Sequence, residues 1–339
     1  NAINGSDDAN VNVADTLQSS AGNDTITGGD GTVIDVVDLS QMPSATGHLV
    51  TSTGNLTVNL ASGTSVDDSA LLGSDTLVGI EGVITGAGAD LVTGSAGANS
   101  IVTGAGADTI TAGSANNLLS GGAGSDSIDA GAGDDTLIYD AADATVDGEA
   151  GTDTLVVRAA SLNLEAAGSG TVLKNLEVID LRGSQGTELT LSVAAVTNLS
   201  TSSNALTVYA DAQDVIHLVG AWTPAANTVV GDAVYRNWTA TCGVTLCISA
   251  AATVRFAGTG NADTVSASTG ADWVLGLAGN DSLSAGNGDD TLLGGAGDDS
   301  LVGEAGTDTV DYSSVSNAVN VNLTTGTATG EGTDTLTTI

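Results

Sequence analysis

The chain of 339 residues is poor in the residues from which ordinary globular cores are built. It contains only four Tyr, three Trp and one Phe, together with two prolines. Large aromatic side chains dominate the packing energy of most cores, so their scarcity argues against a globular core and for thin, stacked layers of backbone. The sequence also contains no uncharged apolar run of about 18 residues, the length that a transmembrane helix needs.

Basic residues are equally scarce. Five Lys and Arg stand against 41 Asp and Glu, which gives a formal net charge of −36. This charge excludes nucleic acid and anionic membrane surfaces as partners, so we expect neither nucleic-acid binding nor membrane insertion. Self-repulsion opposes a compact state, yet the mean hydropathy of +0.21 is too high for a disordered acidic tail. The composition therefore predicts a protein that folds when it binds cations.

Residues for catalysis are few. The chain has two histidines, His48 and His217, and contains neither the H-E-x-x-H motif of zinc proteases nor the G-x-S-x-G motif of lipases. A Ser-His-Asp triad is recognised by geometry and not by order in the sequence. With one histidine in a loop insertion and the other inside a strand pattern, we expect no enzyme.

What the chain does have is a ladder of nine-residue units over residues 257–310. Each unit has an aspartate, an aliphatic residue two positions later and, in five of the six units, a glycine two positions earlier. The aspartates are Asp263, Asp272, Asp281, Asp290, Asp299 and Asp308. A second ladder over residues 81–156 places Asp90, Asn99, Asp108, Asn117, Asp126, Asp135 and, after one skipped unit, Asp153 in the same phase. An isolated unit near the N-terminus contributes Asp24.

These units predict stacked coils. A nine-residue unit cannot bury its own aliphatic side chain, so neighbouring units must share a core. Glycine permits the positive φ of a tight turn, and the residues around each aliphatic form a short strand with that side chain inward. Two units then complete one flattened coil, so that residues eighteen apart lie about 4.8 Å from each other in adjacent coils. The predicted fold class is all-β: a parallel β-roll (β-solenoid) with two rolls separated by a β-rich module.

The stacking lines up carboxylates along two edges of each roll. Carboxylates at this spacing repel each other unless a cation lies between them, and oxygen-rich, glycine-flexed turns suit Ca²⁺. We therefore predict several Ca²⁺ ions in the turns, bound by the in-phase aspartates named above. Asn99 and Asn117 offer only neutral oxygens, so we expect the gap between them to bind weakly or not at all.

The unit resembles the RTX nonapeptide, G-G-x-G-x-D-x-U-x with U aliphatic, over both ladders and the Asp24 unit. In that family, the aspartates of adjacent coils share one Ca²⁺ with backbone carbonyls of the glycine turns. The resemblance implies a secreted protein of the bacterial cell surface that leaves the cell by type I secretion and folds outside it.

Related blocks flank the ladders, within residues 1–80 and 311–339. The strand-like segment 32–80 recurs at the C-terminus in shortened form. Val58-Asn59-Leu60 corresponds to Val321-Asn322-Leu323, and Asp75-Thr76-Leu77 corresponds to Asp334-Thr335-Leu336. In RTX proteins such a block usually leads into a nonapeptide run. We therefore expect a fragment, a processed form, or an end completed by another subunit.

Residues 157–256 lack the repeat and contain all five basic residues and both cysteines. Their strand-like runs, among them residues 187–196, resemble the β-rich spacer of large RTX adhesins, but the pair Asp211 and Asp214 lacks the usual intervening glycine, which disfavours a metal site there. A disulfide between Cys242 and Cys247 requires a tight turn, because the two Cα atoms must come within about 7 Å. An extracellular location favours this bond; the alternative is two small buried residues on one strand.

Three functions fit these features. The first is a structural protein that self-associates, or joins other cell-surface components, in a filament, surface layer (S-layer) or biofilm matrix. The second is a Ca²⁺-stiffened spacer of a large RTX adhesin, used in cell adhesion. The third is the RTX tail of an exported enzyme. Outward-facing Leu275 and Leu293 also predict that one face of the second roll is covered.

Overall fold

The computed structural model describes the chain except for residues 1, 5–15, 19–22, 28–33, 35, 44–48, 52–54, 68–73, 166–171, 185, 201–202, 221, 231–232, 241–242, 250–252 and 268. The chain forms two compact units. Unit 1 comprises Asn1–Val157 and Gly168–Ile179, and unit 2 comprises Arg158–Ala167 and Asp180–Ile339. The five segments predicted from the sequence are thus distributed over two compact bodies.

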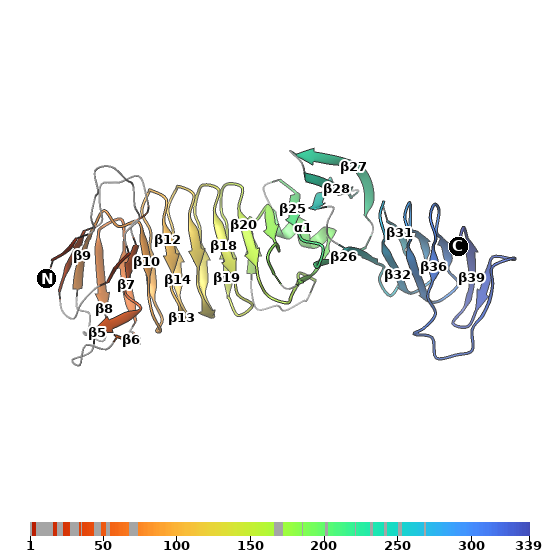
Figure 1. Cartoon of the computed structure of the whole chain (residues 1–339), viewed down its shortest axis with the longest axis horizontal. Coiled ribbons are helices and arrows are strands. Elements are labelled where there is room, and N and C mark those ends of the chain that lie inside the picture. Colours follow the sequence, from red (N-terminus) through yellow and green to blue (C-terminus); the bar gives the residue numbers. More distant parts are fainter. Residues whose placement is uncertain are drawn as a thin grey trace. The chain divides into compact units, whose positions relative to one another are not determined.

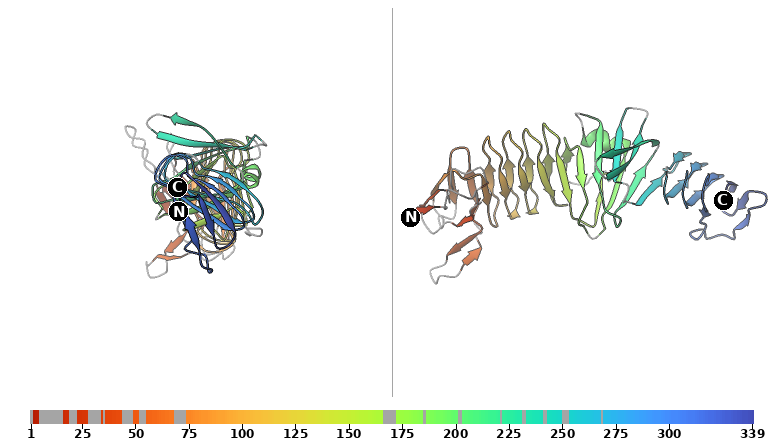
Figure 2. Two further views of the ribbon diagram at one scale, coloured as in Figure 1. Left: turned by 90° about the vertical axis from the view of Figure 1, so that its right-hand side faces the viewer. Right: turned by 45° about the horizontal axis from the view of Figure 1, so that its top comes forward.

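Unit 1 is a parallel β-roll whose coils follow one another in Figure 1 and in the right-hand view of Figure 2. One of its sheets runs in the order β1 (Ala2–Asn4), β3 (Thr25–Thr27), β9 (Ser74–Val78), β8 (Thr64–Asp67), β7 (Leu56–Asn59), β11 (Leu91–Thr93), β14 (Thr109–Thr111), β17 (Ser127–Asp129), β19 (Thr145–Asp147) and β22 (Val172–Lys174). The facing sheet contains, in order, β2 (Thr16–Gln18), β4 (Val36–Asp38), β10 (Gly82–Ile84), β12 (Ser100–Val102), β15 (Leu118–Ser120), β18 (Thr136–Tyr139) and β20 (Thr154–Val157). Two short pairs accompany them: β5 (Gln41–Pro43) with β6 (Leu49–Thr51), and β13 (Ala105–Gly106) with β16 (Ala123–Gly124).

The register of the repeat strands confirms the predicted coil of two units. Ile101 pairs with Leu119 in one sheet, and Ile110 pairs with Ile128 in the other, both in parallel. The inward aliphatic side chains from Val92 to Leu155 are almost completely buried. The continuous core that single units could not form is therefore shared between coils, and the all-β, parallel β-roll prediction is confirmed.

Unit 2 contains the β-rich module and the second roll. One sheet runs β21 (Ser161–Asn163), β24 (Glu188–Ser192), β26 (Val215–Val219), β30 (Thr253–Ala257), β32 (Trp273–Ala278), β34 (Thr291–Ala296) and β36 (Thr309–Val310). A second contains β31 (Thr264–Ser266), β33 (Ser282–Ser284), β35 (Ser300–Val302), β39 (Thr333–Thr337), β38 (Thr327–Thr329) and β37 (Asn320–Asn322). The module also contains four strands that are hydrogen-bonded to one another in the order β25 (Ala205–Tyr209), β29 (Thr245–Ser249), β28 (Ala233–Thr239) and β27 (Thr223–Val230).

The module differs from a nonapeptide roll in two respects. The run after β24, predicted as strand, instead forms helix α1 (Val193–Leu199), because Ser192 caps its start by accepting a hydrogen bond from the Ala195 N–H at 3.2 Å. The module also has an aromatic core, in which Trp238 and Phe256 are buried with ring centroids 6.0 Å apart. None of the helices in the described residues is long and apolar enough to cross a membrane.

The two flanking blocks have the same fold. In the N-terminal copy, β7, β8 and β9 form an antiparallel meander, and β37, β38 and β39 form the same meander in the C-terminal copy. The turn glycines Gly63 and Gly326 have nearly equal positive φ angles, 68° and 64°. The sequence correspondence between the blocks is therefore also a structural one.

Candidate metal centre

The predicted aspartates form columns along the edges of the rolls, and nearly all of them are buried. Asp24, Asp90, Asp108, Asp126, Asp135, Asp153, Asp272, Asp281, Asp290, Asp299 and Asp308 are each at most 9% exposed, as are Asn99 and Asn117. Asp263, at the start of its column, is half-buried. Burial of so many carboxylates requires a compensating partner for each of them.

One oxygen of each carboxylate is used to join coils. Oδ1 of an in-phase aspartate accepts a hydrogen bond from the backbone N–H of its counterpart one coil earlier. The bond from Asp108 N–H to Asp126 measures 2.9 Å, that from Asp135 N–H to Asp153 measures 2.8 Å, and that from Asp263 N–H to Asp281 measures 2.8 Å. Each aspartate therefore supports the coil before it even without a metal.

The other oxygen has no protein partner. Oδ2 of Asp108, Asp126, Asp135, Asp153, Asp281, Asp290, Asp299 and Asp308 is buried without a hydrogen bond in the described part of the chain. A buried carboxylate oxygen without a partner is costly. A cation bound at these Oδ2 atoms would therefore offset the cost of burying them.

The turn glycines leave the space that such a cation needs. A β-carbon on Gly276 would collide with Oδ2 of Asp281 and with the carbonyl oxygen of Gly294. Gly121 and Gly148 lie in the same way against Asp126 and Asp153. We call the space between a turn glycine such as Gly276, the Asp281 carboxylate and the carbonyl of the next coil the cradle. It brings a carboxylate oxygen and backbone carbonyl oxygens together, and this donor set fits Ca²⁺.

Backbone oxygens must supply much of the coordination. Among the described residues, no three His, Cys, Asp or Glu side chains converge on one point as a metal site. Ca²⁺ takes six to eight oxygen ligands, more than one or two carboxylates provide. The residues therefore fit a hard cation held between a turn and its neighbour, and they do not fit a cluster of side-chain ligands such as zinc prefers.

Electrostatics favour the same conclusion. Burial raises the pKa of Asp108 and of Asp135 to about 6, and that of Asp153 to about 7. Burial likewise raises the pKa of Asp281, Asp290 and Asp299. A bound divalent cation would reverse this shift by favouring the charged form.

Four further acids extend the columns. Asp75 accepts the Asp24 N–H at 2.9 Å, Asp334 accepts the Asp299 N–H at 3.1 Å, and Glu177 accepts the Asp153 N–H at 3.1 Å. Asp143 is buried near Asp126, and burial raises its pKa to about 7. Insertions break the nine-residue phase before Asp75, Glu177 and Asp334, whereas Asp143 lies one position before the in-phase position of the skipped unit. The signal for Asp75 and Asp334 was nevertheless present, because each precedes a leucine by two positions.

The asparagines place nitrogen donors where the aspartates place unpaired oxygens. Nδ2 of Asn117 donates to the Ala115 carbonyl at 2.5 Å and to Oδ1 of Asp135 at 3.0 Å. Nδ2 of Asn99 donates to the Glu81 carbonyl at 2.8 Å. An amide N–H group repels a cation, so this geometry supports the expectation of weak or absent metal binding between Asn99 and Asn117.

The fold and its acidic turns define a calcium-binding parallel β-roll. The family model of the RTX calcium-binding nonapeptide repeat (4 copies) matches residues 12–32, 84–119, 111–146, 257–292 and 284–316. These repeats support an RTX calcium-binding protein, a class whose members are typically secreted. A search of curated proteins gave no match.

Replacement of Gly276 by alanine tests the cradle. Gly276 does not have a positive φ, so the substitution acts through the added β-carbon alone. We expect Gly276→Ala to raise the calcium concentration at half-folding of the second roll several-fold, as measured by circular dichroism. Gly260→Ala is the matched control, because a β-carbon there meets nothing within 4 Å; equal midpoints for both variants would contradict the assignment.

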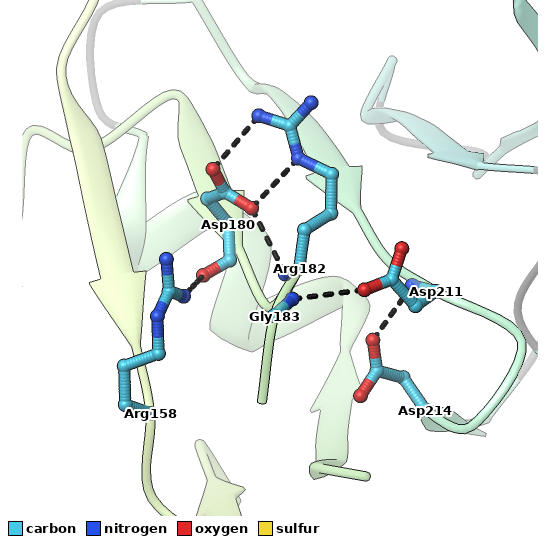
Figure 3. Close-up of polar contacts among 6 residues, drawn as sticks. All are labelled: Arg158, Asp180, Arg182, Gly183, Asp211 and Asp214. Atoms are coloured by element: carbon cyan, nitrogen blue, oxygen red, sulfur yellow. Dashed lines mark hydrogen bonds and ion pairs between the residues drawn. The ribbon is translucent and has the colours of Figure 1, made fainter. Parts of the chain in front are cut away.

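The β-rich module balances its acids without metal. Figure 3 shows Arg182 paired with Asp180 through two hydrogen bonds of 2.9 and 2.8 Å, while Arg158 donates to the Asp180 carbonyl at 3.1 Å. Burial alone would raise the pKa of Asp180, but the hydrogen bonds from Arg182 lower it. The guanidinium also lies 4.6 Å from the ring centroid of Tyr209.

The pair Asp211 and Asp214 is likewise satisfied. Oδ1 of Asp214 accepts from Thr187 N–H at 2.8 Å and Ser184 Oγ at 3.0 Å, and Oδ2 accepts from Asp211 N–H at 2.7 Å. Oδ2 of Asp211 in turn accepts from the Gly183 N–H (Figure 3). These donors engage both oxygens of Asp214, so neither is left without a hydrogen bond as Oδ2 of the column aspartates is.

The remaining predicted residues of the module have no evident chemistry. Cys242, and with it the predicted disulfide to Cys247, lies outside the described residues, as does His48 of the N-terminal block. Cys247 is a half-buried free thiol on β29, and burial raises its pKa. His217 faces Glu188 at 3.8 Å from β26, and its pKa is lowered by burial and by Arg255.

Retention of structure in the module without calcium is therefore expected. In chelator, backbone amides of β25 and β26 should remain protected from hydrogen exchange, because their acids are paired within the module. Amides of β33 and β35, beside the unpaired oxygens of Asp281 and Asp299, should exchange rapidly and gain protection when calcium is added. Loss of protection in all four strands together would show that the module also depends on the metal.

Proposed function

We propose that this protein is a non-enzymatic structural protein, secreted with its two rolls unfolded, that completes its folding on meeting calcium and assembles at the bacterial cell surface into a filament, surface layer or matrix. Without calcium, the net charge of −36 and the unpaired oxygens oppose folding. Extracellular calcium modules bind at roughly 10⁻⁴–10⁻³ M, so calcium outside the cell would trigger folding.

The observation that supports assembly is a difference between the two flanking blocks. In the N-terminal block, strand β7 pairs in parallel with β11, the strand of this sheet with which the ladder over residues 81–156 begins. There Val58 is 0% exposed and Leu60 is 8% exposed. Their counterparts beside β37, Val321 and Leu323, are 42% and 60% exposed.

In this proposal, β37 is the joint, that is, the strand through which one molecule pairs with the next. It is an edge strand with apolar side chains exposed, and such edges are templates for pairing with another chain. Its structural counterpart is covered by a nonapeptide coil. We infer that a nonapeptide coil of another molecule covers β37 in the assembly, which would extend the sheet from one molecule to the next.

Light scattering during a calcium titration from chelator upward tests the proposal. The wild-type chain should first contract and then gain mass as polymers form. Val321→Glu should contract but remain monomeric, whereas Val172→Glu, at a comparably exposed valine of unit 1, should polymerise as the wild type does. A compact wild-type monomer at all calcium concentrations would overturn assembly and favour the adhesin spacer. Unchanged polymers from Val321→Glu would exclude β37 as the joint.

A further inference from the structure

An apolar pocket of about 360 Å³ opens on the outer face of the second roll. Its floor is formed by Leu275 and Leu277 of β32 and by Leu293 of β34. Leu275 pairs with Leu293, and Leu277 with Gly295, so these side chains lie on neighbouring strands of one sheet. Strands β32 and β36, on either side of β34, are labelled in Figure 1.

Leu277 stands where the repeat favours glycine. It occupies the second position of its nonapeptide and has a φ of 80°, a conformation that is strained for a bulky side chain. The corresponding Gly295 has a φ of 95°. Leu277 is also 50% exposed, so its side chain does not recover the strain by joining the core. A leucine that adds strain and stays exposed to solvent suggests a role in binding.

The wall and rim of the pocket are held in place and are acidic. Tyr312 lines one side, and its hydroxyl donates to Oδ2 of Asp334 at 2.7 Å. Asp311 and Glu331 contribute two carboxylates. Asp311 accepts the Ser313 N–H at 2.7 Å, which lowers the pKa of Asp311 and keeps it charged. Of the described residues that line the pocket, none is basic.

We propose that this pocket binds a basic, apolar peptide segment of another protein. An aliphatic side chain of the peptide fills the space above Leu275, Leu277 and Leu293. An adjacent Lys or Arg pairs with Asp311 and Glu331. The acidic rim argues for a cationic partner through charge complementarity, and the chain itself has only five basic residues. This inference goes beyond the proposed function because it concerns a partner other than a second copy.

Calorimetric titration of the full chain at saturating calcium tests the pocket, with a synthetic (Lys-Leu)₆ peptide as probe. Peptides of (Lys-Ser)₆ and (Glu-Leu)₆ separate the charge from the apolar contribution. We expect Leu277→Gly to weaken (Lys-Leu)₆ binding about tenfold, because it removes part of the floor, and Glu331→Gln to weaken it severalfold. Neither variant should lose the fold, since glycine relieves the strain at position 277 and Glu331 is exposed.

Glu304→Gly is the matched control. Glu304 also occupies a second nonapeptide position with a φ of 73°, so its replacement relieves the same kind of strain, but it does not line the pocket. It should bind (Lys-Leu)₆ as the wild type does. Equal binding by the wild type, Leu277→Gly and Glu304→Gly would mean nonspecific attraction to the net charge and would overturn the proposal. Equal binding of (Lys-Leu)₆ and (Lys-Ser)₆ by the wild type would overturn it as well.

Discussion

A chain with Asp281→Asn should need roughly tenfold more calcium to fold its second roll than the wild-type chain, because the charge of the ligands sets the affinity of such sites. Asp281 is 2% exposed and lies between Asp263 and Asp299 in its column. Its Oδ1 accepts the Asp263 N–H, while its buried Oδ2 faces the Gly276 cradle without a protein partner. In the shared-ion arrangement it serves two gaps, so the amide would weaken both.

Asp263→Asn is the matched control for this prediction. Asp263 is half-buried and begins the column, so it serves one gap only. Its Oδ2 already accepts the Thr259 N–H at 2.6 Å and the Thr259 hydroxyl at 2.8 Å. We therefore expect a much smaller shift, measured as the free calcium concentration at half-maximal circular dichroism. Equal midpoints for the two variants would exclude the shared-ion model.

Acidification should favour folding in the absence of calcium and should oppose the folding that calcium induces. Asp108, Asp135 and Asp153 have raised pKa values of about 6, 6 and 7 in the metal-free roll, because burial disfavours their charged forms. An unfolded aspartate has a pKa of about 3.9. Protonation therefore favours the metal-free folded state: the contribution is fully present below about pH 4 and is lost as the pH rises through 6 to 7.

Calcium reverses the direction of this pH dependence, because the ion binds the charged carboxylates and must displace their protons. In chelator, β-structure should increase as the pH falls from 8 to 5. In calcium titrations, the midpoint should instead rise several-fold over the same interval. Circular dichroism at a series of free calcium concentrations, at pH 8 and pH 5, measures both effects. A calcium midpoint that stays constant or falls at pH 5 would contradict the prediction.

The repeat made much of this fold accessible from sequence. Nine-residue spacing fixes which side chain points inward, and the eighteen-residue coil follows from it. The buried Ile110 and Leu283, and the aspartate columns, therefore lie where the phase places them. The correspondence of the flanking blocks held as well, since a shared pattern such as Asp75-Thr76-Leu77 implies a shared local structure.

Features that break the period could not be predicted in the same way. Glu177 reaches its column through an insertion, and no spacing rule gives the path of an insertion. Asp143 lies one position out of phase in the skipped unit, so the spacing rule passes over it. Helix α1 was missed because an apolar run of that length suits a strand or a helix equally, and the Ser192 cap decides between them. The strain at Leu277 is a backbone property that became evident only from its φ angle.

The asparagines at in-phase positions of the first roll imply that the two rolls fold at different calcium concentrations. Asn99 and Asn117 bring no charge into their edge, and their amide groups already bridge turns through hydrogen bonds. The second roll has an aspartate at each of its six in-phase positions. Because the charge of the ligands sets the affinity of such sites, we expect the second roll to fold at a lower calcium concentration than the first. A concentration gradient across the cell envelope would then be converted into an order of events along a single polypeptide.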